Sequence, residues 1–332
     1  MSAEVEAMRT FWPTPSAEAL ERVADFEDGE LAQVLDAMGL KGEHISEIVA
    51  HWRSVQDSAS WASLLAAGLT VVARDRGNVD AALPIWPDLD EEGDVGRLFY
   101  FYLFALCFSD TLIFWRSNCV PENVIDSTIN VLVQHTATHL RKLGTLGVDA
   151  GWWMLLVLRG ELLSIGSLEF HHVNLGVGTL APEWYSTDDP LVRTPGFRRG
   201  DSSMGIHIPQ GADLSPAAVD RTLREARAVI ARVWPGATRR LATCRSWMME
   251  DRLAGALAPD SNLVLFLERF TLVPGWVNGD EDVVDFVFRL PHTPLEELPQ
   301  NTTLERFVVA LLRSGEHFHV RTGWFDFDGV SP

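Results

Sequence analysis

The stretch Ser203-Met-Gly-Ile-His-Ile-Pro-Gln-Gly-Ala-Asp-Leu-Ser-Pro216 contains a short strand, a glycine turn and a helix start in direct succession. Met204 to Ile208 is short and half apolar, and Pro209 ends this strand because proline has no N–H to donate to a neighbouring strand. Gly211 permits a turn that other residues resist. The pair Ser215-Pro216 is typical of a helix start. The stretch therefore predicts the kind of strand-turn-helix unit on which α/β folds bind ligands.

The helix expected after Ser215 has one apolar stripe. Its apolar residues recur at alternating spacings of four and three: Val219, Leu223, Ala226, Ile230 and Val233. The free N–H groups of its first turn point back at the loop from Pro209 to Leu214, and such a terminus suits an anion such as a phosphate. The alternative is an ordinary strand-to-helix connection without a ligand, because sequence matches of this size are frequent by chance.

Length and composition describe a soluble globular protein. A chain of 332 residues is long for one hydrophobic core, so we expect two domains. The net charge of -19 argues against nucleic acid as a partner, because nucleic-acid binding relies on clustered Lys and Arg. The same charge suits a cationic substrate such as an amine, although an ordinary soluble surface also explains it.

The sequence predicts a cytoplasmic protein without a membrane partner. Met1 to Thr10 carries charged residues and no apolar segment, so it is not a signal peptide. The apolar run from Leu98 to Trp115 is interrupted by Ser109 and Asp110, which favours a buried helix over a spanning one. The cysteines are too few and too scattered for a disulfide framework or a metal site: Cys107, Cys119 and Cys244.

The first half of the chain has helical spacing nearly throughout, and we assign residues 1–147 to a helical domain. The helices that we expect cover residues 17–26, 30–38, 43–56, 60–73, 94–116 and 121–143. His135 and His139 lie four residues apart and could place two metal ligands on one helix face. No third ligand has a persuasive spacing, so packed or solvated histidines are favoured and we expect no metal.

The second half, residues 148–332, alternates strands and helices. Trp152 to Leu158 and Leu162 to Val173 are expected to form a hairpin around Gly160-Glu161, followed by a long loop over 174–202. After the helix that follows Ser215, we expect strands over 241–248, 283–289 and 317–327 and helices over 250–257 and 302–312. Thr302-Thr-Leu-Glu305 has the pattern of a capping box. The state of 263–270 is left open.

This order of elements resembles the acyl-CoA N-acyltransferase fold known as the GNAT fold. Seven strings sharpen the resemblance: Phe114-Trp-Arg-Ser-Asn-Cys-Val-Pro121, Gly160-Glu-Leu-Leu-Ser-Ile-Gly-Ser-Leu-Glu-Phe170, His207-Ile-Pro-Gln-Gly211, Cys244-Arg-Ser-Trp247, Pro259-Asp-Ser-Asn262, Leu298-Pro-Gln-Asn-Thr-Thr-Leu304 and Arg321-Thr-Gly-Trp324. Together they look like a bacterial family, frequent in actinobacteria, that joins a helical acyltransferase-associated domain to a GNAT-like domain. The resemblance implies an α+β protein with an all-helical N-terminal domain and a mixed central sheet in its C-terminal domain.

The resemblance also implies where the co-substrate acyl-CoA binds. In GNAT enzymes the thioester lies beside a central strand, and the pyrophosphate lies on the turn that leads into the next helix. The corresponding residues here are Ile206, Ile208, Gln210, Gly211, Ala212, Leu214 and Ser215. Asp213 departs from the family pattern, because a carboxylate beside a pyrophosphate is unfavourable. Either Asp213 points away, or the donor is held in another manner. Arg245 also departs from it, standing where the family is expected to have His.

Amide formation requires a base for the acceptor amine and a donor for the departing thiolate. His207 and Glu169 are the candidate bases and Ser246 is the candidate donor. The alternatives are that His207 is a structural residue and that Glu169 faces solvent. Cys244 is a further candidate, as a nucleophile, but a cysteine is commonly buried and inert. The function implied is transfer of an acyl group from a CoA thioester to an amine of a small molecule or peptide. The alternative is a catalytically degenerate GNAT scaffold that acts as a binding protein.

Overall fold

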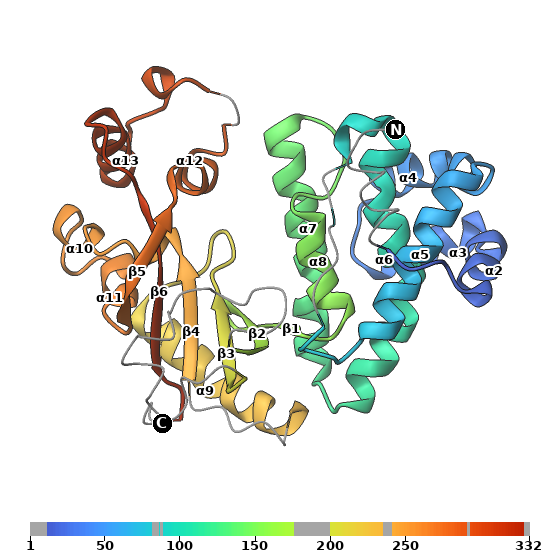
Figure 1. Cartoon of the computed structure of the whole chain (residues 1–332), viewed down its shortest axis with the longest axis horizontal. Coiled ribbons are helices and arrows are strands. Elements are labelled where there is room, and N and C mark those ends of the chain that lie inside the picture. The colour runs from blue at the N-terminus through green and yellow to red at the C-terminus, as the bar shows by residue number, and fades with distance from the viewer. Residues whose placement is uncertain are drawn as a thin grey trace. The chain divides into compact units, whose positions relative to one another are not determined.

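A computed structural model describes residues 12–81, 86, 89–175, 200–234, 241–290 and 293–328 (Figure 1). The chain forms two compact units, residues 1–163 and residues 164–332, which we call the helical unit and the sheet unit. The helix over 151–158 packs on other helices of the first unit, whereas the sequence led us to expect a division after residue 147. Most of the loop expected over 174–202 lies outside the described residues.

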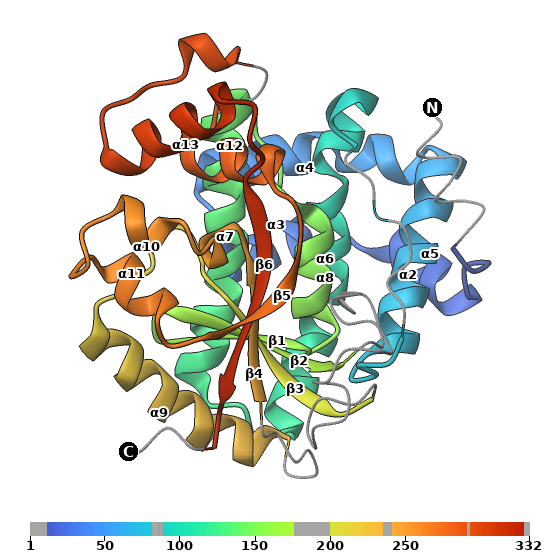
Figure 2. The same cartoon turned by 60° about the vertical axis from the view of Figure 1, so that its left-hand side comes forward.

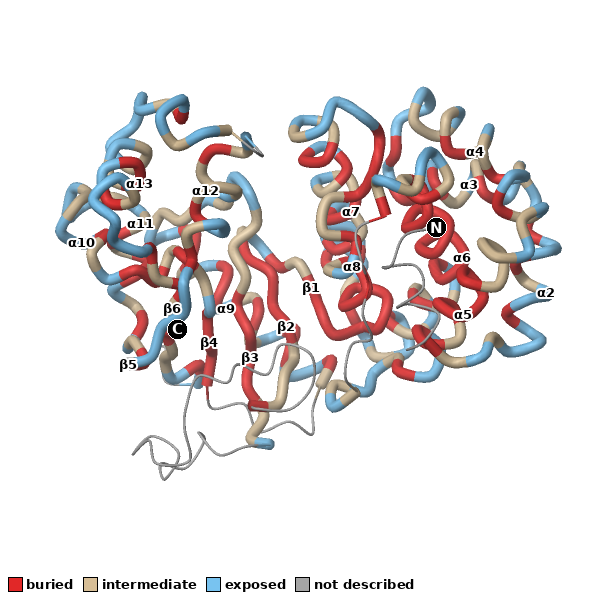
Figure 3. Tube along the Cα trace, turned by 45° about the horizontal axis from the view of Figure 1, so that its top comes forward, coloured by how far each residue is buried: buried red, intermediate tan, exposed pale blue. Residues whose placement is uncertain are grey.

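In the described residues, the helical unit contains the helices expected from the sequence and two more. They are α2 (Ala17–Asp25), α3 (Asp28–Ala37), α4 (Gly42–Gln56), α5 (Ala59–Asp75), the short η1 (Asp90–Glu92), α6 (Gly93–Ser117), α7 (Glu122–Leu143) and α8 (Gly151–Leu158). α6 packs against α3, α4, α5 and α8 and is buried along most of its length (Figure 3). By length and composition, the stretch Asp90–Ser117 could cross a membrane, but 72% of its most apolar window is buried inside the structure. A helix that is apolar all round and buried in this way is a core helix.

The sheet unit contains a mixed sheet, as expected (Figure 2). In the described residues its six strands lie in the order β1-β2-β3-β4-β6-β5. β3 and β4 are parallel, whereas β2/β3, β4/β6 and β5/β6 are antiparallel. The strands are β1 (Leu162–Ile165), β2 (Leu168–Asn174), β3 (Ser202–His207), β4 (Leu241–Ser246), β5 (Thr271–Asn278) and β6 (His319–Asp326). The helices are α9 (Pro216–Val233), η3 (Trp247–Met249), α10 (Leu253–Ala256), α11 (Asn262–Leu267), α12 (Asp280–Phe288), η4 (Leu295–Glu297) and α13 (Thr303–Arg313).

α9 is the helix expected after Ser215, and it covers one face of the sheet. All members of its predicted apolar stripe are buried. Thr222 on α9 accepts a hydrogen bond from the backbone N–H of Ser167 in the β1–β2 turn at 3.1 Å. Arg227 lies over the ring of Phe327, which in turn faces Phe170 on β2. Because side chains alternate along a strand, the face that carries Phe170 is the α9 face, and Glu169 points to the opposite one.

The hairpin expected over 152–173 is wrong in its first half. Residues 151–158 form helix α8, and the hairpin joins β1 to β2 through Gly166-Ser167. Gly160 adopts φ +76° and its N–H bonds to the carbonyl of Val157, so it ends a helix instead of turning a hairpin. A continuous apolar run fits a buried strand and a buried helix equally well, so its periodicity could not decide between them.

The strand expected over 283–289 is also wrong, because these residues lie in helix α12. The first turn of α12 is rich in acidic residues, which the positive end of a helix favours. The strand in this region is the preceding β5, which the sequence analysis missed. β5 contains Pro274 and Gly275 at a register shift, and proline is tolerated there because β5 is an edge strand. Of residues 263–270, whose state was left open, 263–267 lie in α11 (Asn262–Leu267).

The capping box at the start of α13 is confirmed and leads to a stability prediction. Thr302 Oγ1 accepts the N–H of Glu305 at 3.1 Å, and Glu305 Oε2 accepts the N–H of Thr302 at 2.9 Å. Thr302→Ala should lower the free energy of unfolding by about 1 kcal/mol, because one helix-terminal N–H loses its acceptor. Urea unfolding measures this change, with Thr303→Ala as the control at the next residue. A large loss of acyl transfer at unchanged stability would contradict a purely structural role.

Candidate functional site

Glu169 and His207, the two candidate bases, lie directly opposite each other on β2 and β3. Opposed residues of antiparallel strands have neighbouring side chains on the same side of the sheet. This side is the one opposite to α9. Glu169 is 4% exposed, so it does not face solvent. The structure therefore brings together two side chains that stand far apart in the sequence.

A second histidine, His171, shares this face and was missed by the sequence analysis. It lies opposite Gly205 on β3 and is 2% exposed. Its ring centroid is 5.7 Å from that of His207, with 37° between the ring planes. The signal that could have found it is the strand period of two, which places residue 171 on the same face as residue 169.

The surroundings of His207 favour its neutral form. Burial lowers the pKa of His207 well below its ordinary value, and the neighbouring His171 lowers it further. At neutral pH the ring is therefore uncharged, which is the form that can accept a proton from a substrate.

β3 and β4 separate beside this pair. Within the described chain, their parallel ladder joins only residues 203–205 to residues 241–243. β3 nevertheless continues to His207 and β4 to Ser246. Ile206, near the end of β3, and Ile208, just after it, therefore lie beside the place where the two strands part.

The turn after β3 has the form that its glycine predicts. Gly211 has φ +77°, and the N–H of Ala212 bonds to the carbonyl of Pro209 at 3.1 Å. A Cβ added to Gly211 would meet no atom within 4 Å, so the space above the turn is open. The turn leads directly to Ser215, which is the N-cap residue of α9.

The start of α9 differs from the expected cap in its chemistry. The hydroxyl of Ser215 makes no capping bond, and instead Asp213 Oδ1 accepts the N–H of Ser215 at 2.9 Å. This backbone hydrogen bond lowers the pKa of the exposed Asp213, so its negative charge lies at the helix start. Arg269, another residue that the sequence analysis missed, lies beside the same turn. It pairs with Asp220 at 2.6 Å and donates to the carbonyl of Pro216 at 3.4 Å.

Two family models match these two units. One describes an N-acyltransferase N-terminal domain and matches residues 29–160, and the other describes a GNAT-like C-terminal domain and matches residues 162–325. The chain belongs to the two-domain GNAT-like acyltransferases. The fold and the enzymatic interpretation expected from the sequence are thereby confirmed.

Solved acyltransferase structures resemble this acyltransferase along its whole length. An acyltransferase mutant in complex with octanoyl-CoA is 27% identical, covers 97% of this chain and 93% of its own, and has a TM-score of 0.78. An acyltransferase in complex with decanoyl-CoA and teicoplanin is 27% identical, covers 98% of this chain and 93% of its own, and has a TM-score of 0.75. Compared by sequence, none of the curated proteins matches the acyltransferase.

Ser246, the candidate donor, lies apart from the two candidate bases. Thr243 on β4 is the neighbour of Gly205 and therefore shares the face opposite to α9. Ser246 lies three residues further along β4, and because side chains alternate along a strand, it points to the α9 face. Its hydroxyl accepts the N–H of Met248 at 3.1 Å and caps η3. An accepting hydroxyl keeps its own hydrogen to donate. The donor role of Ser246 in this acyltransferase remains a prediction.

Cys244 is not suited to act as a nucleophile in this acyltransferase. The side chain is 1% exposed, and burial raises the pKa of its thiol to about 12. The reactive thiolate is therefore scarce at neutral pH. Arg245, the residue that follows it, is exposed.

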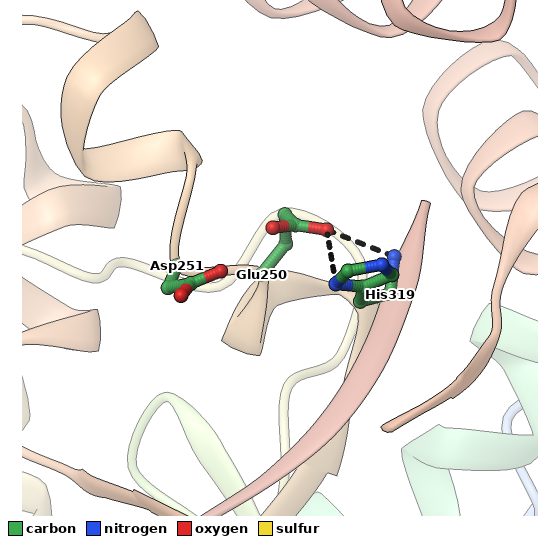
Figure 4. A group of neighbouring side chains, drawn as sticks. All are labelled: Glu250, Asp251 and His319. Atoms are coloured by element: carbon green, nitrogen blue, oxygen red, sulfur yellow. Dashed lines mark hydrogen bonds and ion pairs between the residues drawn. The ribbon is translucent and has the colours of Figure 1, made fainter. Parts of the chain in front are cut away.

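Three side chains of the sheet unit lie close enough together to hold a metal ion (Figure 4). Arginine side chains of the protein already bind this cluster. Glu250, Asp251 and His319 each place one such atom within 4.8 Å of the others. Arg252 binds Glu250 with two bonds of 2.8 Å and 2.7 Å, and Arg321 lies 3.3 Å from Asp251. Burial acts to raise the pKa of Glu250, but hydrogen bonds from Arg252 and from two backbone N–H groups lower it to about 2. We interpret the cluster as an ion-pair network and assign no metal to it.

The histidines of α7 are packed residues of the acyltransferase, as favoured from the sequence. His135 Nδ1 bonds to the carbonyl of Asp149 at 2.6 Å. His139 Nδ1 bonds to the carbonyl of Thr145 at 2.8 Å, and its Nε2 lies 2.9 Å from Asp90. These bonds hold the loop after α7 and leave no ring nitrogen of His139 for a metal.

Proposed function

We propose that this acyltransferase moves a medium-length fatty acyl group from CoA to an amine of a glycopeptide-type acceptor, with His207 as the general base. The proposal is carried by the Glu169–His207 pair beside the place where β3 and β4 separate. It is supported by the acyltransferase neighbours in complex with octanoyl-CoA, decanoyl-CoA and teicoplanin. The coarser conclusion, a small-molecule or peptide acceptor for an acyl-CoA donor, rests on the same neighbours.

The donor site that we propose follows the strand, the turn and the helix start. The thioester lies along the edge of β3 that faces β4, beside Ile206 and Ile208. The pyrophosphate lies on the Gly211 turn, where the space is open and the first N–H groups of α9 are directed. The residues of this site are Ile206, Ile208, Gln210, Gly211, Ala212, Leu214 and Ser215.

The reaction needs a base for the attacking amine, a donor for the departing sulfur and one bond exchange. The neutral imidazole of His207 takes a proton from the acceptor's nitrogen as that nitrogen attacks the thioester carbonyl. A C–N bond forms, the C–S bond breaks, and CoA departs as a thiolate, to which the hydroxyl of Ser246 is proposed to donate a hydrogen bond. The proton held by His207 then passes to the thiolate or to solvent, which restores the neutral base. The carboxylate of Glu169, opposite His207, stabilises the imidazolium that results.

Product analysis with a defined acceptor tests the proposal. The full chain is incubated with decanoyl-CoA and teicoplanin aglycone bearing a free amine, and thiol release and product mass are followed together. We expect acceptor-dependent thiol release and a product heavier by one decanoyl group. An acceptor whose amine is blocked by acetylation is the matched control and should give neither. Thiol release that is independent of any acceptor, with free decanoic acid as the product, would contradict acyl transfer to an amine.

A further inference from the structure

His171 stands beside His207 on the face of the sheet opposite to α9, and the proposed reaction does not use it. It is 2% exposed, and its ring lies 5.7 Å from that of His207, centroid to centroid. Two imidazoles thus lie in contact on one buried face of the sheet.

Gly205 makes room for this contact. It is the register partner of His171 and precedes His207 by two residues, so all three point to one face. A Cβ added at residue 205 would lie 3.4 Å from His171 Cβ and 3.4 Å from His207 Nε2. The ring of His207 thus lies back along β3, over the position that a larger side chain at residue 205 would fill.

We propose that His171 is a positioning residue for His207: it supports the ring against the sheet and, as a second imidazole at short range, opposes protonation of His207 before the acceptor delivers its proton. The inference rests on the proposed role of His207 as the base. His171 contacts the base and does not touch the reacting atoms, so it acts on the reaction only through His207.

The charges around His207 determine the sign of the effect. Burial is the largest cause that lowers the pKa of His207, and His171 is the second. A carboxylate favours a neighbouring imidazolium, so we expect Glu169, opposite His207 on β2, to act in the other direction. On β4 the nearest charged residue of this face is Arg245, whose charge is in turn felt by Asp282 of α12. Without His171, burial remains while one opposing group is lost, so the pKa of His207 should rise.

The functional consequence is a wider pH range for catalysis. A base is active only in its unprotonated form, so the rate falls as the pH drops through the pKa of the base. By keeping that pKa low, His171 lets His207 accept a proton in mildly acidic solution. As the pH is lowered, variants that lack the imidazole of residue 171 should begin to lose activity at a higher pH than the wild type does.

The test compares two neighbouring histidines on opposite faces of β2. His171→Phe keeps a ring in place and removes the ionisable group, and His171→Gln is a second variant in case the first does not fold. His172→Gln is the matched control, because His172 points to the α9 face, where it lies 3.3 Å from Ser202 and packs against Trp234. Circular dichroism establishes that each variant is folded.

The first measurement needs neither substrate nor turnover. The full chain is labelled with carbon-13 histidine, the His207 signal is assigned by its loss in His207→Gln, and the imidazole shifts are followed by NMR through a pH titration. We expect the titration of His207 to move to higher pH in both His171 variants and to stay unchanged in His172→Gln. An unchanged titration of His207 in the folded His171 variants would overturn the inference.

The second measurement is the pH profile of kcat/KM, and it separates the inference from the proposed function. The acid limb should move to higher pH by the interval that NMR gives for His207. If the NMR titration moves but the acid limb does not, His207 is not the base, and the proposed mechanism fails together with the role of His171 in it. If neither moves while His207→Gln abolishes the acid limb, His207 is the base and only the role of His171 is wrong.

Gly205 gives an independent variant for the positioning part. Valine is favoured in strands, so Gly205→Val should not weaken β3 as such. Its side chain would fill the space over which the His207 ring lies, and a displacement of about 1 Å can reduce the rate by about 100-fold. We expect a loss of that order in kcat, with Gly205→Ala close to the wild type because its Cβ makes an ordinary contact. A Gly205→Val enzyme with the wild-type kcat would show that the ring position does not matter.

Discussion

His207→Ala should lower kcat by about 100-fold to 10,000-fold, the range that a positioned general base contributes. The alanine variant leaves the acceptor amine to lose its proton to water, so the acid limb that belongs to His207 should also disappear from the pH profile. Steady-state rates of thiol release across pH measure both effects. Acyl-CoA binding should persist, because the proposed donor residues of the Gly211 turn are intact.

Two further variants define what this result means. His172→Ala removes a histidine from the other face of the same sheet and should keep both the rate and the acid limb. Glu169→Gln should lower the rate less than His207→Ala, because it removes only the carboxylate that stabilises the imidazolium. If His207→Ala and Glu169→Gln both retain the wild-type pH profile with a working substrate, neither residue is the base.

The second large effect concerns the donor. At a hundredfold excess over its dissociation constant, a ligand that binds only the folded protein stabilises it by about 2.7 kcal/mol. Decanoyl-CoA should therefore raise the thermal unfolding temperature of the wild type, and Gly211→Val should abolish that shift. A β-branched side chain opposes the φ of +77° at this position and fills the open space in which we place the pyrophosphate.

Gly315 provides the matched control for the strain at Gly211. It has φ +82°, and a Cβ added there would also meet no atom within 4 Å. Gly315→Val should therefore carry a similar backbone cost but keep the full shift with decanoyl-CoA. Loss of the shift in both variants would mean that it reflects general destabilisation and not the donor site. A full shift in Gly211→Val would place the donor elsewhere.

Asp213→Asn tests the sign of the charge at the same helix start. The carboxylate of Asp213 bonds to the N–H of Ser215, so it stands where a phosphate is expected to approach. An asparagine oxygen can keep that bond without the charge, and acyl-CoA should then bind more tightly. The dissociation constant measured by calorimetry reports this directly. Unchanged affinity would mean that the phosphates do not come near Asp213.

The sequence predicted best those elements whose ends are chemically marked. Ser215-Pro216 and the Thr302 capping box located the starts of α9 and α13, because caps and proline act within one turn. It predicted worst the segments whose state depends on burial. The run 152–158 became a helix and β5 went unrecognised, since an apolar run or a proline in an edge strand carries no local mark of the final packing.

For the candidate site, the residue types were predictable but their arrangement was not. The resemblance to the GNAT fold and the chemistry of amide formation selected Glu169 and His207, yet their direct opposition follows from the register of β2 and β3, which no local pattern specifies. His171 was missed because a buried strand histidine resembles a structural one. Arg269 was missed because its partner Asp220 lies on another element of the fold.

Two strands, β1 and β5, lie at the edges of the sheet that the described residues form, and they bear on how the protein behaves when it is abundant. An open sheet edge can recruit a strand from another molecule and begin aggregation. Here β1 is only four residues long, and β5 is interrupted by Pro274 and a register shift between Leu272 and Trp276. Neither edge offers a long, regular row of backbone donors and acceptors. Strand-mediated self-association through these two edges is therefore disfavoured.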